Sequence, residues 1–176
     1  SLVVVAVAGK IYAIGGANDE GCCDAVEAYD PLSGLWSQAA SLPVARGSHT
    51  ATVVDGKIYV VGGEIDDDDD DEAVDMDRVD MYDPAAGSWQ QVAEIPTVRS
   101  SHAAAVVDGK IYVSGGLAET GQYSDALEAY DPVADTWATL ASLSQARAYH
   151  ASAVINGQLY VFGGLAALVQ PLVEVY

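Results

Sequence analysis

The sequence predicts an all-β protein in which small four-stranded sheets stack around an axis as the blades of a β-propeller. Three observations predict this fold. Strings of alternating apolar and polar residues, the pattern of half-buried strands, recur along the chain, and no stretch shows helical periodicity. Each string closes on a glycine pair, and the pairs are 47, 53 and 48 residues apart. The four pairs are Gly15-Gly16, Gly62-Gly63, Gly115-Gly116 and Gly163-Gly164.

The second unit illustrates the strand order expected for all units. Asp55-Gly56 is a two-residue hairpin signal that joins the first strand to the second. Asp83-Pro84 begins a turn that ends near Gly87 and joins the third strand to the fourth. The unit is therefore an antiparallel meander, with strands expected over 49–54, 57–61, 79–82 and 89–95.

A sheet of this kind cannot bury both faces by itself, so neighbouring units are expected to stack. The alanine-rich first strands suit the crowded axis, whereas Trp36, Trp89 and Trp137 suit the wide outer part, where rings can fill the space between diverging sheets. The glycine pairs would let neighbouring backbones approach closely. We expect a single domain over 1–176, with blades at approximately 1–43, 44–96, 97–144 and 145–176.

The fourth unit differs from the others, because the sequence ends at Tyr176, before the turn and the tryptophan strand. Three complete four-stranded blades plus a three-stranded fourth are expected, as a four-bladed or partial ring, of which we favour the four-bladed one. The third strand of the last blade would be an exposed outer edge. Such edges pair readily with other chains, so self-association through this blade is expected.

The order R-x-x-H, G-K-I-Y-x-x-G-G, Y-D-P and W resembles the kelch repeat over essentially the whole chain. The resemblance implies a β-propeller of kelch type that binds partner proteins, as in many ubiquitin-ligase adaptors and scaffolds. It also implies a binding face built from the variable loops, which follow each glycine pair, and from the residues just before each inner strand. By position these residues are Ser48, Ser101 and Tyr149, with loop residues Asn18, Asp19, Glu64, Thr120, Gln122 and Tyr123.

The variable loops differ in length between units while the other spacings stay fixed, which indicates exposed segments. Two interpretations of the acidic second loop are open: a disordered, solvated segment that aids solubility, or a segment that attracts a basic peptide. Calcium binding is a third hypothesis, although the run lacks the spacing of an EF-hand loop. The acidic run consists of Asp66, Asp67, Asp68, Asp69, Asp70, Asp71 and Glu72.

Each of the three histidines follows an arginine by three residues, so both belong to the repeat. A zinc site is conceivable for three histidines, but the repeat position favours a role in building the blades, and no metal is predicted. The arginines could have a structural role, in which they pair with the aspartate of a nearby Y-D-P turn or bond loop carbonyls. Alternatively, they hold an acidic ligand at the channel mouth, and we favour the structural role. The residues are Arg46, Arg99 and Arg147, His49, His102 and His150, and the turn residues Asp30, Asp83 and Asp131.

The net charge of −19 argues against nucleic acid and anionic membranes as partners. The sequence contains no uninterrupted apolar run of membrane-spanning length and no signal-peptide pattern. Cys22 and Cys23 have no metal-ligand or redox spacing, and we expect their neighbours Glu20 and Asp24 to raise the thiol pKa values. A reducing compartment is expected, the cytoplasm first and the nucleus as the alternative.

These observations favour a non-catalytic module that binds a partner protein or peptide around the channel mouth, without a cofactor. The alternative is an enzyme that acts on a sugar or sugar acid at the same mouth, because some kelch propellers are catalytic. The polar candidates belong to the repeat or to the acidic run, so neither a catalytic residue nor an enzymatic activity is predicted.

Overall fold

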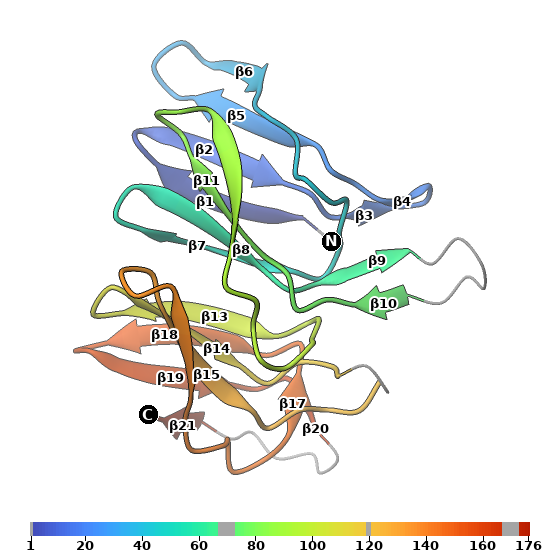
Figure 1. Ribbon diagram of the computed structural model, residues 1–176, viewed down its shortest axis with the longest axis vertical. Coiled ribbons are helices and arrows are strands. Elements are labelled where there is room, and N and C mark those ends of the chain that lie inside the picture. Colours follow the sequence, from blue (N-terminus) through green and yellow to red (C-terminus); the bar gives the residue numbers. More distant parts are fainter. Residues whose placement is uncertain (1, 67–72, 119–120, 167–172) are drawn as a thin grey trace.

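The computed structural model describes residues 2–66, 73–118, 121–166 and 173–176. Within these ranges the regular elements are β-strands, and the four main sheets are arranged as the blades of a β-propeller (Figure 1). Three sheets contain four strands and the last contains three, with β21 as its outer edge. The predicted fold class, the blade count and the incomplete last blade are confirmed.

All four blades run from an inner strand near the axis to an outer strand. Blade 1 contains β1 (Val3–Val7), β2 (Lys10–Ile14), β5 (Val26–Asp30) and β6 (Leu35–Gln38). Blade 2 contains β7 (Thr50–Val54), β8 (Lys57–Val61), β11 (Val79–Asp83) and β12 (Ser88–Val92). Blade 3 contains β13 (Ala103–Val107), β14 (Lys110–Ser114), β15 (Leu127–Asp131) and β16 (Thr136–Thr139). Blade 4 contains β18 (Ala151–Ile155), β19 (Gln158–Phe162) and β21 (Val173–Val175).

Short antiparallel pairs outside the blades were not predicted. Strands of two or three residues are too short to show a period-two pattern, so the sequence gives no signal for them. They order the loops that follow the glycine pairs and, in blade 4, tie such a loop to the preceding linker. The pairs are β3 (Ala17–Asn18) with β4 (Gly21–Cys22), β9 (Glu64–Asp66) with β10 (Ala73–Asp75), and β17 (Arg147–Ala148) with β20 (Leu165–Ala166).

The blades stack in sequence order, with β1 against β7, β7 against β13, and β13 against β18. A buried apolar cluster fills each interface; between blades 1 and 2 it includes Tyr12 and Ile14 on one side and Ile58 and Tyr82 on the other. Successive side chains of a strand point to opposite faces of its sheet, so one set faces the preceding blade and the other set faces the following blade. Stacking therefore buries the faces that a lone sheet would expose.

The prediction that the tryptophan rings fill the space between neighbouring sheets is correct for two of the three tryptophans. Trp89 and Trp137 pack between blades, and their Nε1 atoms donate hydrogen bonds to the carbonyls of Ala40 at 2.8 Å and Ala93 at 2.9 Å. Trp36 is 54% exposed. Each tryptophan lies on the face toward the preceding blade, and no described blade covers that face of blade 1.

The predicted close approach is confirmed for both glycines of the pairs in blades 2 and 3, whereas a Cβ atom on Gly163 in blade 4 would meet no described atom within 4 Å. A Cβ atom on Gly62 would lie 2.6 Å from the carbonyl oxygen of Arg99, and one on Gly63 would lie 2.5 Å from that of Gly47. Both glycines also have positive φ, at 55° and 96°. Larger residues would push away the linkers that carry the chain into the neighbouring inner strands.

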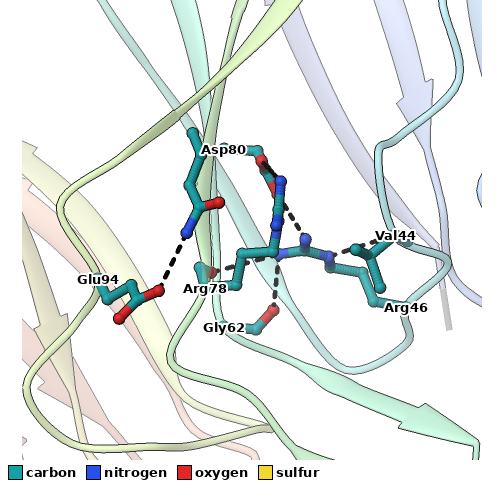
Figure 2. A network of polar contacts seen from close by, with 7 residues as sticks. Val44, Arg46, Gly62, Arg78, Asp80 and Glu94 are labelled. Atoms are coloured by element: carbon teal, nitrogen blue, oxygen red, sulfur yellow. Dashed lines mark hydrogen bonds and ion pairs between the residues drawn. The ribbon is translucent and has the colours of Figure 1, made fainter.

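In each of the three linkers, one buried arginine bonds to the blade that follows the linker. The Nη2 atom of Arg46 lies 2.5 Å from Oδ2 of Asp80 on β11, and both side chains are 0% exposed (Figure 2). Its Nη1 atom donates to the carbonyls of Gly62 and Arg78, each at 3.3 Å. Arg78 binds the other side of the same carboxylate, with its Nη2 atom 2.7 Å from Oδ1.

The same contact recurs in blades 3 and 4, where Arg99 pairs with Glu128 at 2.6 Å and Arg147 pairs with Glu174 at 2.8 Å. The carbonyl contacts fit the predicted structural role, but the predicted pairing with the Y-D-P turns and the alternative of an arginine facing a ligand are wrong. The Y-D-P turns lie at the opposite end of the blades from the linkers. The turn aspartates of blades 2 and 3, Asp83 and Asp131, instead face Lys57 and Lys110.

The histidines are also buried between blades. His102 Nε2 lies 2.8 Å from Thr50 Oγ1 of the preceding blade, and His150 Nε2 lies 2.9 Å from Ser114 Oγ. Burial, reinforced by the nearby arginine charge, lowers the pKa values of His49 and His150 to about 4. The histidines are therefore neutral packing residues at physiological pH.

Replacing Arg99 by Met should lower the free energy of unfolding by about 3–5 kcal/mol, because it leaves the Glu128 carboxylate buried without its cation. The double variant Arg99→Met/Glu128→Leu should recover a large part of the loss, since no unpaired charge remains. Urea denaturation measures both values. A loss below about 1 kcal/mol in the single variant would show that the pair does not stabilise the blade.

The free energy of unfolding should fall as pH drops from about 6.5 to 4. In this window the histidines of the unfolded chain are protonated, whereas His49 and His150 in the folded protein, with pKa values of about 4, stay neutral. Protonation therefore favours the unfolded state. Each histidine contributes about 1.4 kcal/mol per unit of pKa difference. Urea denaturation between pH 7 and 4.5 measures the slope, and His49→Gln should reduce it. An equal slope in wild type and variant would contradict the assignment.

Candidate binding rim

One rim of the propeller gathers the variable loops and the linkers between blades. The pairs β3–β4 and β9–β10 project from this side in Figure 1, whereas the hairpins between first and second strands lie on the other. We call this surface the loop rim. Its described residues are 17–25, 40–49, 64–66, 73–78, 93–102, 117–118, 121–126 and 140–150.

The structure brings together the three predicted residues that precede the inner strands. Ser48, Ser101 and Tyr149 all adopt left-handed backbone conformations, with φ of 50°, 52° and 55°. The Ser101 N–H donates to the carbonyl of Ser48 at 2.8 Å, and the Tyr149 N–H donates to the carbonyl of Ser101 at 2.9 Å. These bonds run from blade to blade, so the three residues form a preordered arc at the ends of the inner strands.

The side chains of this arc differ in what they offer a ligand. Tyr149 is 59% exposed and presents both an aromatic face and a hydroxyl group. Ser48 is half-buried, and its hydroxyl donates to Oε1 of Glu64 at 2.8 Å. Ser101 is also half-buried. A partner that reaches the arc therefore meets one large ring beside small hydroxyl-bearing residues.

The remaining predicted residues lie in the variable loops of the same rim. Asn18 and Asp19 are exposed in the first loop, where Asn18 Oδ1 accepts a hydrogen bond from the Glu20 N–H at 2.8 Å. Gln122 and Tyr123 are exposed in the third loop. Thr120 lies outside the described residues.

Asp66 links the first two variable loops, a contact that the sequence did not reveal. Its Oδ2 atom accepts a hydrogen bond from the Cys22 N–H at 2.5 Å, across 44 positions of sequence. Gly21 suits the position beside it, because its φ of 112° is one that residues with a Cβ atom rarely adopt, and a Cβ atom there would displace the Asp66 carboxylate. The rest of the acidic run, Asp67 to Glu72, lies outside the described residues, so its role stays a prediction.

Cys22 is half-buried between these loops. Burial, followed by the charge and hydrogen bond of Asp66, raises the pKa of its thiol to about 11. The direction agrees with the prediction, but the cause is burial and a residue from the next blade, not the sequence neighbours Glu20 and Asp24. The thiol is protonated at neutral pH and is a poor nucleophile.

A metal centre has no support in the described part of the chain, where no three histidine, cysteine, aspartate or glutamate side chains are grouped as metal ligands. None of the described residues forms a helix long and apolar enough to cross a membrane. The chemistry of the loop rim is that of an exposed aromatic ring, amides, hydroxyls and carboxylates.

The chain is similar to known proteins over most of its length. The KLHDC2/KLHL20/DRC7 Kelch-repeats domain family matches residues 1–168. Mouse Kelch-like protein 35 is 31% identical over 128 residues, which is 72% of this chain and 20% of that protein. An F-box/kelch-repeat protein of Arabidopsis thaliana is 37% identical over 116 residues, which is 64% of this chain and 29% of that protein.

A solved structure, that of YjhT, shares the fold with a TM-score of 0.80 at 19% identity, and the match covers 93% of this chain and 58% of that one. The match to the two curated relatives above covers 20% and 29% of their lengths, so the chain spans only about a fifth to a third of those proteins. The repeat motifs, the four blades and the family match over residues 1–168 lead to one conclusion: the chain belongs to the kelch-repeat family.

Proposed function

We propose that the loop rim binds a partner protein and that the chain acts as a non-catalytic interaction module. The observation that carries this proposal is the hydrogen-bonded arc of Ser48, Ser101 and Tyr149, because it holds an exposed aromatic ring in a fixed position among the loops. Preordered aromatic residues are typical binding hot spots, since little conformational entropy is lost when a partner covers them.

The electrostatics of the rim favour a basic partner. The second variable loop places Glu64 and Asp66 at the rim and continues into a run of further acidic residues. A chain of net charge −19 attracts a cationic peptide and repels nucleic acid and anionic membranes. Such attraction acts mainly on the rate of association and weakens as salt screens it.

We further propose that the module recognises a target for a larger assembly, such as a ubiquitin-ligase adaptor. Support comes from the F-box/kelch-repeat relative and from the kelch-like proteins, of which this chain matches only a part. The free cysteines suit a reducing compartment, the cytoplasm or the nucleus.

An enzyme acting on a sugar or sugar acid is the other candidate that the sequence suggested, and no observation favours it. The histidines that could serve catalysis are buried between blades, and the arginines are buried where each linker meets the following blade. Those contacts give a structural reason for their presence.

Tyr149→Ala should weaken partner binding about tenfold or more, because it removes the exposed ring at one end of the arc. Affinity capture with mass spectrometry identifies the partner, and titration of that partner measures binding. Leu32→Ala is the control, since it also removes a large exposed side chain, which is 99% accessible and lies on the opposite rim. Unchanged circular dichroism excludes unfolding, and full binding by Tyr149→Ala would contradict the proposed surface.

Replacing Asp67 to Asp71 by serine should slow association with a lysine-rich synthetic peptide, chiefly at low salt. Asp66 is kept, because it bonds the Cys22 N–H. Stopped-flow fluorescence measures the rate at several salt concentrations. The control variant Asp55→Asn/Asp108→Asn removes two charges from hairpins on the opposite rim. A salt-independent effect, or an equal effect in the control, would rule out recruitment by the acidic loop.

A further inference from the structure

Blade 1 carries the acceptor groups of a contact that is complete, with its arginine, in blades 2 and 3. In blades 2 and 3 one guanidinium binds three acceptors: two backbone carbonyls and a carboxylate on the third strand. In blade 3 these are the carbonyls of Gly115 at 3.0 Å and Ala126 at 3.2 Å, and Glu128 Oε2 at 2.6 Å, all bound by Arg99. Arg46 binds the equivalent set in blade 2 (Figure 2).

The same three acceptors exist in blade 1, as Gly15, Ala25 and Glu27. Glu27 pairs with Ala13 of β2 in the register in which Glu128 pairs with Val113 of β14. The Gly15 N–H donates to the carbonyl of Ala25 at 2.9 Å, as the Gly115 N–H does to that of Ala126 at 2.9 Å. The backbone of blade 1 is thus shaped as in the blades that bind an arginine.

The carboxylate of this set is exposed. The equivalent residues Asp80 and Glu128 are almost completely buried under their arginines. Glu27 instead accepts a hydrogen bond from Gln38 Nε2 at 3.0 Å, and no ion pair reaches it from any residue that the structure describes. Glu27 thus occupies the acidic position of the repeat, but no described residue supplies the arginine that the equivalent carboxylates have in blades 2 and 3.

The surface around Glu27 has the features of a blade interface. Val4 and Trp36 are exposed beside it on the outward face of blade 1. In blades 2 and 3 the equivalent tryptophans donate to a carbonyl of the linker that arrives from the preceding blade. Each of these linkers also buries an apolar side chain four residues before its arginine, Leu42 before Arg46 and Ile95 before Arg99.

We propose that Gly15, Ala25 and Glu27 form a guanidinium-binding site, which takes the arginine of a peptide segment from outside residues 1–176. The segment lies over the outward face of blade 1 and offers a carbonyl to the Trp36 indole. It carries a leucine or isoleucine four residues ahead of the arginine. A charge-assisted contact with Glu27 and two carbonyls selects arginine over lysine, because only the guanidinium presents several donors in one plane.

The test attaches a copy of residues 92–100, VAEIPTVRS, directly ahead of Ser1. Its arginine then stands in front of β1 where Arg99 stands in front of β13. A matched extension has glutamine in place of that arginine. We expect the arginine extension to raise Tm by about 3 °C or more over the glutamine extension. Glu27→Gln should abolish this difference, and Glu27 is exposed, so the variant should fold normally.

Glu20→Gln controls for net charge, because it removes the same charge from an exposed loop residue and should keep the difference in Tm. A blue shift of Trp36 fluorescence, measured in a Trp89→Phe/Trp137→Phe background, should accompany only the arginine extension with Glu27 intact. Equal Tm values for the two extensions would show that the face takes any apolar segment. That outcome, or a difference that survives Glu27→Gln, overturns the proposed site.

Discussion

The fold depends on the interface between neighbouring blades, because no blade has a core of its own. Apolar side chains on facing sheets supply the buried area, and a buried arginine fixes where each linker meets the next blade. In blade 3 the guanidinium donates to two carbonyls and to the Glu128 carboxylate, and it supplies the cation that this buried carboxylate needs. The interface therefore determines both stability and the path of the linker.

The same interface positions the candidate binding surface. Once the arginine has fixed the linker, the chain turns through a left-handed residue into the inner strand, and these residues bond to one another from blade to blade. Tyr149 thereby holds its place through backbone contacts, leaving its ring exposed. The side chains at these positions are not needed for this order, because the bonds from blade to blade are made by the backbone.

The repeat made most of the fold predictable from the sequence. The first three strands of blade 2, the Asp55-Gly56 hairpin and the close approach at Gly62-Gly63 follow from local patterns and are present in the structure. The fourth strand, predicted over 89–95, ends at Val92 because the chain from there on forms the linker. The partners of the arginines did not follow, because Asp80 and Glu128 lie on third strands whose distance from the linker only the folded sheet determines. The Asp66–Cys22 bond was hidden for the same reason, since it joins loops of different blades.

Blade stacking preorders the loop rim, and amide hydrogen exchange of Ser101 and Tyr149 measures this order. Their N–H groups donate across blade boundaries to the carbonyls of Ser48 and Ser101. We expect protection close to that of the inner-strand amides, because exchange requires the blades to separate. Exchange as fast as that of the exposed amides at Asp19 and Gln122 would mean that the arc is not held in place, and would contradict this expectation.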